Sequence, residues 1–305
     1  MKRRSFIKLG SLAGGSLLVA SKFKSFAFTA NDQDKSIFRL NYAPHFGMFQ
    51  SSAGNDLIDQ LNFMADQGFR SMEDNGMKDR TVADQEKIAI KMSGREMKMG
   101  VFVAHKIYWK EPNLAGGNKD LRKEFLSQIR ESVEVAKRVN AKWMTVVPGH
   151  LDLHLEMGYQ TANVVESLKQ ACAILEPHGL IMVLEPLNFR DHPGLFLKKT
   201  AQAYSICKAV NSPSCKILFD IYHQQITEGN LIPNINMAWD EIAYFQIGDN
   251  PGRKEPTTGE INFKQVFGYI KSKGYADILG MEHGNSQPGK EGENEVINAY
   301  RVVDP

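Results

Sequence analysis

The chain has 305 residues, of which 42% are hydrophobic and 24% are charged, and its formal net charge is +2. This length allows one large domain or two small ones. The first 27 residues carry six Lys and Arg and no Asp or Glu, so the net charge without them is −4. Such a balance gives no support to nucleic-acid binding. The three cysteines, Cys172, Cys207 and Cys215, show neither CxxC nor zinc-site spacing. Their odd number permits one disulfide at most, and we expect Cys172 and Cys207 to be core thiols.

The N-terminus has the features of a bacterial export signal. It opens with MKRRSFIK, which resembles a twin-arginine signal, and an apolar segment over residues 9–20 is too short to span a bilayer comfortably. A small-x-small cleavage site falls at residues 25–27. We therefore expect an export signal over residues 1–27, read by the twin-arginine export machinery, and a periplasmic domain over residues 28–305 without a stable membrane anchor. The alternative is a disordered basic tail.

Eight short apolar runs follow, and their starts are 27 to 44 residues apart. They lie at 38–44, 70–76, 99–105, 143–150, 181–188, 216–223, 243–250 and 278–284. Amphipathic stretches separate them, and the clearest is residues 118–141, with apolar positions at helical spacing. Alternating strands and helices indicate a parallel sheet, and eight such units predict an α/β fold of the (β/α)8 TIM barrel type. A doubly wound sheet is the competitor, but the GxGxxG turn typical of it is absent.

Polar side chains stand at the ends of the last four predicted strands, where a barrel places its active site. They are Glu185, Asp220, Gln246 and Glu282. A buried carboxylate is costly when it is unpaired, and carboxylates that converge repel one another unless a cation lies between them. Four oxygen donors favour a hard divalent cation, Mg²⁺ or Mn²⁺ before Zn²⁺. The alternative is that each of the four side chains has a separate hydrogen-bonded partner, which is less favoured because all four lie on successive strands.

The later motifs resemble the hydroxypyruvate isomerase family of the xylose isomerase-like TIM barrel superfamily. They read LEPLN, FDIYHQQITEGNL, FQIGDNPGRKEPTTGEINF and MEHG. The likeness covers most of residues 38–284 and is sharp from about residue 181 onward. The export signal is a departure from the family, and so are the second and third strands, which do not match its substrate-binding segments. Both departures affect the assignment of the substrate more than the assignment of the reaction.

The resemblance also implies roles for particular residues. The family's metal ligands correspond to Glu185, Asp220, Gln246 and Glu282. Its two proton-transferring groups correspond to Glu185 and Glu282, and the related ketose epimerases hold substrate oxygens where this chain has His223 and Arg253. Gln246 matches the hydroxypyruvate isomerases, since the sugar epimerases usually carry His there. Homo-oligomers are common in the superfamily.

These residues and the resemblance together imply a divalent-metal-dependent isomerase. Its substrate would be an α-hydroxycarbonyl compound, such as hydroxypyruvate, tartronate semialdehyde or a related sugar, and it would react through an enediolate using two glutamates. Three alternatives remain open: an exported keto-sugar epimerase, an inosose-type dehydratase, and a non-catalytic sugar-binding barrel. An abasic-site endonuclease is disfavoured because its zinc cluster needs further histidines.

Other polar residues near strand ends carry weaker signals. His45, His105 and His150 follow the first, third and fourth predicted strands and are candidates for lining the pocket. Tyr108 and Trp109 follow the third strand, where an aromatic ring could stack on a sugar. Ordinary loop packing explains all five equally well or better.

Overall fold

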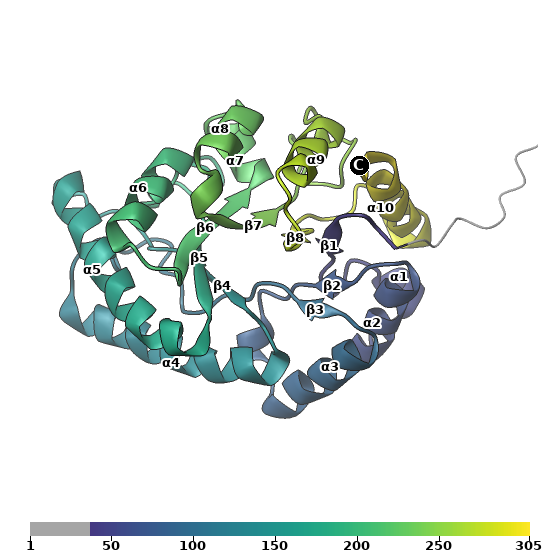
Figure 1. Cartoon of the computed structure of the whole chain (residues 1–305), viewed down its shortest axis with the longest axis horizontal. Helices are drawn as coiled ribbons and strands as arrows, with labels where there is room; N and C mark the ends of the chain where they lie inside the picture. Colours follow the sequence, from purple (N-terminus) through teal and green to yellow (C-terminus); the bar gives the residue numbers. More distant parts are fainter. Residues whose placement is uncertain (1–36) are drawn as a thin grey trace, which may run out of the picture. The chain divides into compact units, whose positions relative to one another are not determined.

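Eight parallel strands alternate with helices over residues 37–305, the part of the chain that the computed structural model describes (Figure 1). The strands are β1 (Asn41–Ala43), β2 (Ser71–Met72), β3 (Lys98–Met99), β4 (Trp143–Val146), β5 (Ile181–Leu184), β6 (Cys215–Asp220), β7 (Ile242–Gln246) and β8 (Ile278–Gly280). The expected export signal, residues 1–27, and the expected domain start at residue 28 lie outside the described residues.

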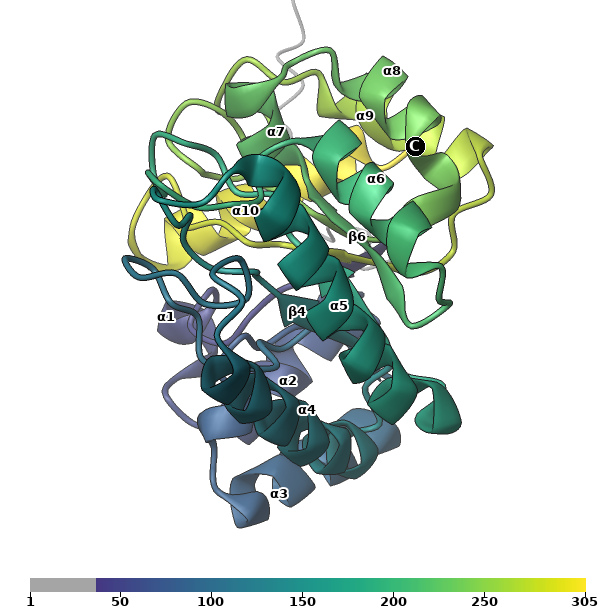
Figure 2. The same ribbon diagram turned by 90° about the vertical axis from the view of Figure 1, so that its left-hand side faces the viewer.

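Ten α-helices within residues 37–305 surround the strands (Figure 1). They are α1 (Gln50–Ala53), α2 (Leu57–Asp66), α3 (Val82–Gly94), α4 (Lys119–Val139), α5 (Met157–Leu175), α6 (Thr200–Val210), α7 (Ile221–Thr227), α8 (Leu231–Met237), α9 (Phe263–Ser272) and α10 (Gly289–Val303). Figure 2 shows the two longest, α4 and α5, side by side outside the strands. None of the helices described is long and apolar enough to cross a membrane.

The strands close into a barrel. Six of them form one sheet in the order β1-β8-β7-β6-β5-β4, and β2 pairs with β3. Single bridges complete the ring, because His45 pairs with Glu73 beyond β1 and β2, and Val103 pairs with Thr145 beside β4. The predicted (β/α)8 barrel is therefore confirmed. The second and third strands are shorter than the runs at 70–76 and 99–105 suggested, because only two residues of each make ladder pairs.

Local sequence signals set the ends of the helices. The side chain of Asn118 accepts from two backbone N–H groups in the first turn of α4, which is ordinary N-capping. Asn140 ends the same helix in the left-handed conformation at φ 51°, which asparagine tolerates better than most residues. Such caps fix where each helix stops and hence where the next strand enters the barrel.

Apolar side chains fill the barrel interior. One cluster takes a residue from near seven of the eight strands: Ala43, Val101, Trp143, Val183, Leu218, Tyr244 and Ile278, all 5% exposed or less. A larger core lies between the strands and the helices, and it includes the thiols of Cys172 and Cys207. Both are buried and free, as expected, and Cys215 is buried and free as well. Since the interior is packed, a pocket for chemistry can form only at an end of the barrel.

Candidate active site

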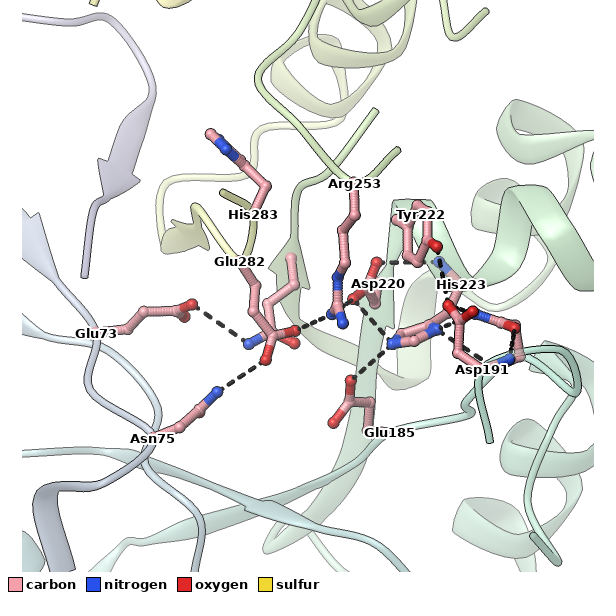
Figure 3. Close-up of polar contacts among 12 residues, drawn as sticks. Glu73, Asn75, Glu185, Asp191, Asp220, Tyr222, His223, Arg253, Glu282 and His283 are labelled. Atoms are coloured by element: carbon pink, nitrogen blue, oxygen red, sulfur yellow. Dashed lines mark hydrogen bonds and ion pairs between the residues drawn. The ribbon is translucent and has the colours of Figure 1, made fainter. Parts of the chain in front are cut away.

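The four predicted donors meet at the carboxyl-terminal end of the strands. Asp220 and Gln246 are the last residues of β6 and β7 and are direct register partners, so their side chains leave the same face of the sheet. Glu185 directly follows β5, and Glu282 lies two residues beyond β8. Ligand atoms of Glu185, Asp220, Glu282 and His223 all lie within 4.8 Å of one another (Figure 3).

Burial gives these acids unusual proton affinities. Glu185 is 6% exposed and Asp220 is fully buried. Burial, reinforced by the charges of Glu282 and Asp220, raises the pKa of Glu185 well above its usual range. Burial also raises the pKa of Glu282 to about 7. For Asp220, burial is outweighed by His223, Arg253 and two backbone N–H groups, so its pKa is lowered. Two glutamates that hold protons readily thus flank one ionised aspartate.

His223 is fixed as a hydrogen-bond donor toward the acids. Asp220 caps α7 by accepting from the backbone N–H of His223 at 3.1 Å, which turns the imidazole back over the strand end. The backbone N–H and the side-chain amide of Asn188 lie 3.3 and 2.7 Å from the His223 Nδ1. Asn188 is itself oriented, because its Oδ1 accepts from the backbone N–H groups of Arg190 and Asp191.

Two donors aimed at Nδ1 make it an acceptor, so the proton of the neutral ring lies on Nε2. Burial lowers the pKa of His223 to about 4, so the ring is neutral. Nε2 lies 3.6 Å from Asp220 Oδ2 and 3.8 Å from Glu185 Oε1, and it has no hydrogen-bond partner among the described residues. In this tautomer, His223 can donate to a ligand oxygen but cannot bind a cation through Nε2.

Arg253 lies against the acids. Its Nη2 is 2.6 Å from Glu282 Oε2 and 3.0 Å from Asp220 Oδ2, and its guanidinium lies 5.1 Å from the centre of the Tyr222 ring. The side chain is 29% exposed, so one side of it remains open to solvent. Arg253 therefore neutralises part of the acidic cluster and can still reach a ligand.

Two residues of the second strand region also belong to the site, and neither is among the residues predicted from the sequence. Asn75 donates to Glu282 Oε1 at 2.8 Å (Figure 3). The buried Glu73 accepts from the Tyr244 hydroxyl at 2.9 Å. Burial and the charge of Glu282 raise the pKa of Glu73 well above its usual range. The sequence RSMEDNG could have revealed Glu73, because it places an acid in a predicted buried strand, as IMVLEPLN does for Glu185.

The donors of the cluster fit a divalent cation. Three carboxylates converge, and the Oε1 of Gln246 is a buried acceptor without a hydrogen-bond partner among the described residues. A buried oxygen left unpaired is costly, whereas a cation would satisfy it. All four groups offer oxygen, which suits Mg²⁺ or Mn²⁺ better than softer ions.

The other predicted pocket residues lie outside the acidic cluster. His45 contacts the backbone oxygen of His283, and His105 is buried against Val147. His150 contacts the backbone oxygen of Leu151. Tyr108 donates to Glu124. Trp109 is 45% exposed and stacks on His192 with centroids 5.1 Å apart, and His192 contacts His223 edge-on at 5.5 Å. Trp109 is thus linked to His223 through His192.

Residues 61–302 match the family described as Xylose isomerase-like TIM barrel, and the chain belongs to that family. The chain is 32% identical over 160 residues to hydroxypyruvate isomerase of Escherichia coli (strain K12), and 30% identical over 160 residues to 2-oxo-tetronate isomerase of Cupriavidus necator. Each match covers 52% of this chain and 62% of the relative.

Solved structures show the same fold. An AP endonuclease, family 2, from Brucella melitensis superposes with a TM-score of 0.73 at 24% identity, covering 83% of this chain and 96% of the other. The 3-keto-D-glucoside 4-epimerase of Escherichia coli gives a TM-score of 0.73 at 16% identity, covering 87% of this chain and all of the other. At such identities, the likeness concerns the fold alone.

Proposed function

We propose that this protein is a divalent-metal-dependent isomerase of α-hydroxycarbonyl compounds, with hydroxypyruvate and tartronate semialdehyde, or a related sugar, as its substrate pair. The observation that carries the proposal is the pair of glutamates, Glu185 and Glu282, whose oxygens meet around Asp220. Binding alone requires no paired bases, whereas moving a proton between two carbons does. The relatives named hydroxypyruvate isomerase and 2-oxo-tetronate isomerase support the same chemistry.

Glu185, Asp220, Gln246 and Glu282 would hold the cation, which we propose to be Mg²⁺ or Mn²⁺. When bound, such an ion supplies Lewis-acid polarisation of a carbonyl oxygen and stabilises negative charge that develops beside it. The unpaired Oε1 of Gln246 supports this assignment, because a purely hydrogen-bonded acid cluster would leave that oxygen without a role.

The protein's own groups would move the proton. One glutamate removes a proton from the hydroxyl-bearing carbon of the substrate, which gives the enediolate. The same glutamate or the opposite one returns a proton to the former carbonyl carbon. The hydroxyl proton passes to the former carbonyl oxygen, so atoms and charges balance and the reaction is an isomerisation without net oxidation. His223 donates its Nε2–H to a substrate oxygen, and Arg253 holds a substrate carboxylate through its guanidinium.

An epimerase is the second candidate, and the same residues would serve it. Return of the proton to the opposite face of the same carbon inverts a centre rather than moving a carbonyl group. The observation that favours this candidate is Trp109, an exposed ring linked to the site through His192, because such a ring suits the apolar face of a sugar. Gln246 favours the isomerase, through the resemblance of its motif.

Proton exchange in D₂O separates these possibilities. Protein comprising residues 28–305 would be incubated with Mn²⁺ or Mg²⁺ and with hydroxypyruvate or a panel of ketoses and keto-sugars, and NMR would follow the loss of the α C–H signal. We expect metal-dependent exchange that Glu185→Gln and Glu282→Gln abolish and that Glu293→Gln, at a buried acid of α10, leaves intact. Exchange accompanied by a new isomer identifies an isomerase. The absence of exchange on every substrate, with metal bound, contradicts the proposal.

A further inference from the structure

The carboxylate of Glu73 is buried inside the barrel and does not lie on its surface. It is 1% exposed, and its Oε2 accepts from the Tyr244 hydroxyl at 2.9 Å. That hydroxyl in turn lies 3.4 Å from the backbone N–H of Val101, so its own proton is committed to Glu73. Glu73 and Tyr244 thus form a fixed pair that joins the second strand region to β7.

Two glycines leave room for this pair. A Cβ added at Gly280 of β8 would overlap the carboxylate of Glu73, and one added at Gly100 would overlap the hydroxyl of Tyr244. Neither glycine has a backbone conformation that requires glycine, since neither has a positive φ. Glycine is therefore required at these positions because a side chain would collide with Glu73 or Tyr244, and not because a turn needs it.

The free oxygen of Glu73 faces the amide of Gln246. The Gln246 Nε2 donates to Glu73 Oε1 at 3.4 Å, while the Gln246 Oε1 is buried and has no partner among the described residues. A bound cation nearby favours the ionised form of Glu73, and rotating the amide by half a turn would then bring two acceptor oxygens together, which is unfavourable. Glu73 therefore dictates which end of the amide is free.

We infer that Glu73 is a positioning residue that holds Gln246 with its oxygen turned toward the cation. The inference rests on the metal site of the proposed function. Groups behind a ligand commonly fix its orientation, and their loss weakens metal affinity about ten- to a hundredfold. Glu73 does so from the opposite half of the barrel, without touching the cation or the substrate.

The sharpest test exchanges the two functional groups. In Glu73→Gln, the new amide oxygen accepts the Tyr244 proton, and the new NH₂ faces Gln246, whose oxygen then turns away from the cation. In the double variant Glu73→Gln with Gln246→Glu, the NH₂ at position 73 donates to one carboxylate oxygen, and the other is free for the cation. The double variant keeps the total charge, so it restores the donor pattern.

Mn²⁺ binding by calorimetry and thermal melting without metal are the readouts. We expect Glu73→Gln to weaken Mn²⁺ binding about ten- to a hundredfold, and the double variant to return to within about tenfold of the unmodified protein. Glu293→Gln, a buried acid that accepts from the backbone N–H groups of Ser51 and Ser52, is the matched control and should change melting only.

Unchanged Mn²⁺ affinity in Glu73→Gln, or a double variant as weak as the single one, would overturn the inference while leaving the metal site intact. Failure of the unmodified protein to bind Mn²⁺ would overturn the metal site and the inference with it. Because the double variant carries the same substitution at position 73, its recovery also excludes misfolding as the cause of the weaker binding.

Discussion

The two halves of the barrel are built differently. In the β5–β8 half, the strands have three to six residues and pair in ladders, and every candidate metal ligand lies at or just beyond a strand end. In the β1–β4 half, β2 and β3 have two residues each and join their outer neighbours through isolated bridges. The first half carries the donors, and the second half supplies Glu73 and Asn75, which contact those donors. The β5–β8 half thus supplies the candidate metal ligands, and the β1–β4 half supplies groups that orient them.

The largest effects should come from the glutamates of the β5–β8 half. Glu185→Gln and Glu282→Gln each remove a group that we propose to transfer a proton and to bind the cation, so we expect kcat to fall by about a thousandfold or more. Steady-state kinetics on the substrate identified by the exchange experiment would measure this. If either variant kept a tenth of the activity, the proton would be moved by another group, and the division between the halves would be wrong.

Arg253→Met tests charge balance in the same half. It leaves Asp220 and Glu282 facing each other without a cationic side chain. We expect a loss of about 2 to 3 kcal/mol in the free energy of unfolding, less than for a fully buried ion pair because Arg253 is 29% exposed.

Urea unfolding with and without Mn²⁺ would measure this change. Added Mn²⁺ should recover part of the loss, since a cation replaces the missing charge, and Arg253→Lys should lose less because it keeps that charge. Equal losses in both conditions would show instead that Arg253 stabilises its loop through packing.

His105 tests the β1–β4 half through acid sensitivity. It is buried, accepts from the backbone N–H of Val147 and lies edge-on to Phe125, and burial lowers its pKa to about 4 from 6.5, with Lys78 adding to the effect. The unfolded chain therefore takes up the proton first. The resulting stability is complete above pH 6.5 and is lost as the pH falls toward 4.

We expect the loss through His105 between pH 7 and pH 5 to be about 2 kcal/mol. His105→Phe should remove it, so the variant should have the flatter pH dependence even if it is less stable at pH 7. Urea titrations at the two pH values would measure the difference. His223 and His283, whose pKa values burial lowers to about 4 and about 3, titrate in both proteins and cancel. Parallel curves would show that His105 is not the source.

The sequence predicted the donors of the β5–β8 half better than their supports. Buried strands that end in an acid are visible as apolar runs, so Glu185 and Asp220 could be placed from their neighbours alone. Glu73 has the same signal, but its partner Tyr244 lies 171 positions away, and no spacing reveals that pairing. The tautomer of His223 likewise depends on Asn188, which lies on another loop. Contacts between distant strands require the closed barrel.

The smallest effect should come from Asn75. Its size tests whether the β1–β4 half only orients reacting groups or takes part in the reaction itself. Asn75 is exposed and donates to Glu282 Oε1 at 2.8 Å, so it orients a group that we propose to transfer the proton, without being one itself. We expect Asn75→Ala to lower kcat about tenfold, the equivalent of about 1.4 kcal/mol, with little change in Mn²⁺ affinity, because the other ligands remain. Asn75→Asp, which places a second charge beside Glu282, should lower kcat further.

Kinetics and calorimetry on the same preparations would measure both quantities. A loss in Asn75→Ala as large as that in Glu282→Gln would make Asn75 part of the chemistry and would erase the contrast between the halves. A tenfold loss would confirm that the β1–β4 half acts on the reaction only through the groups it holds in place.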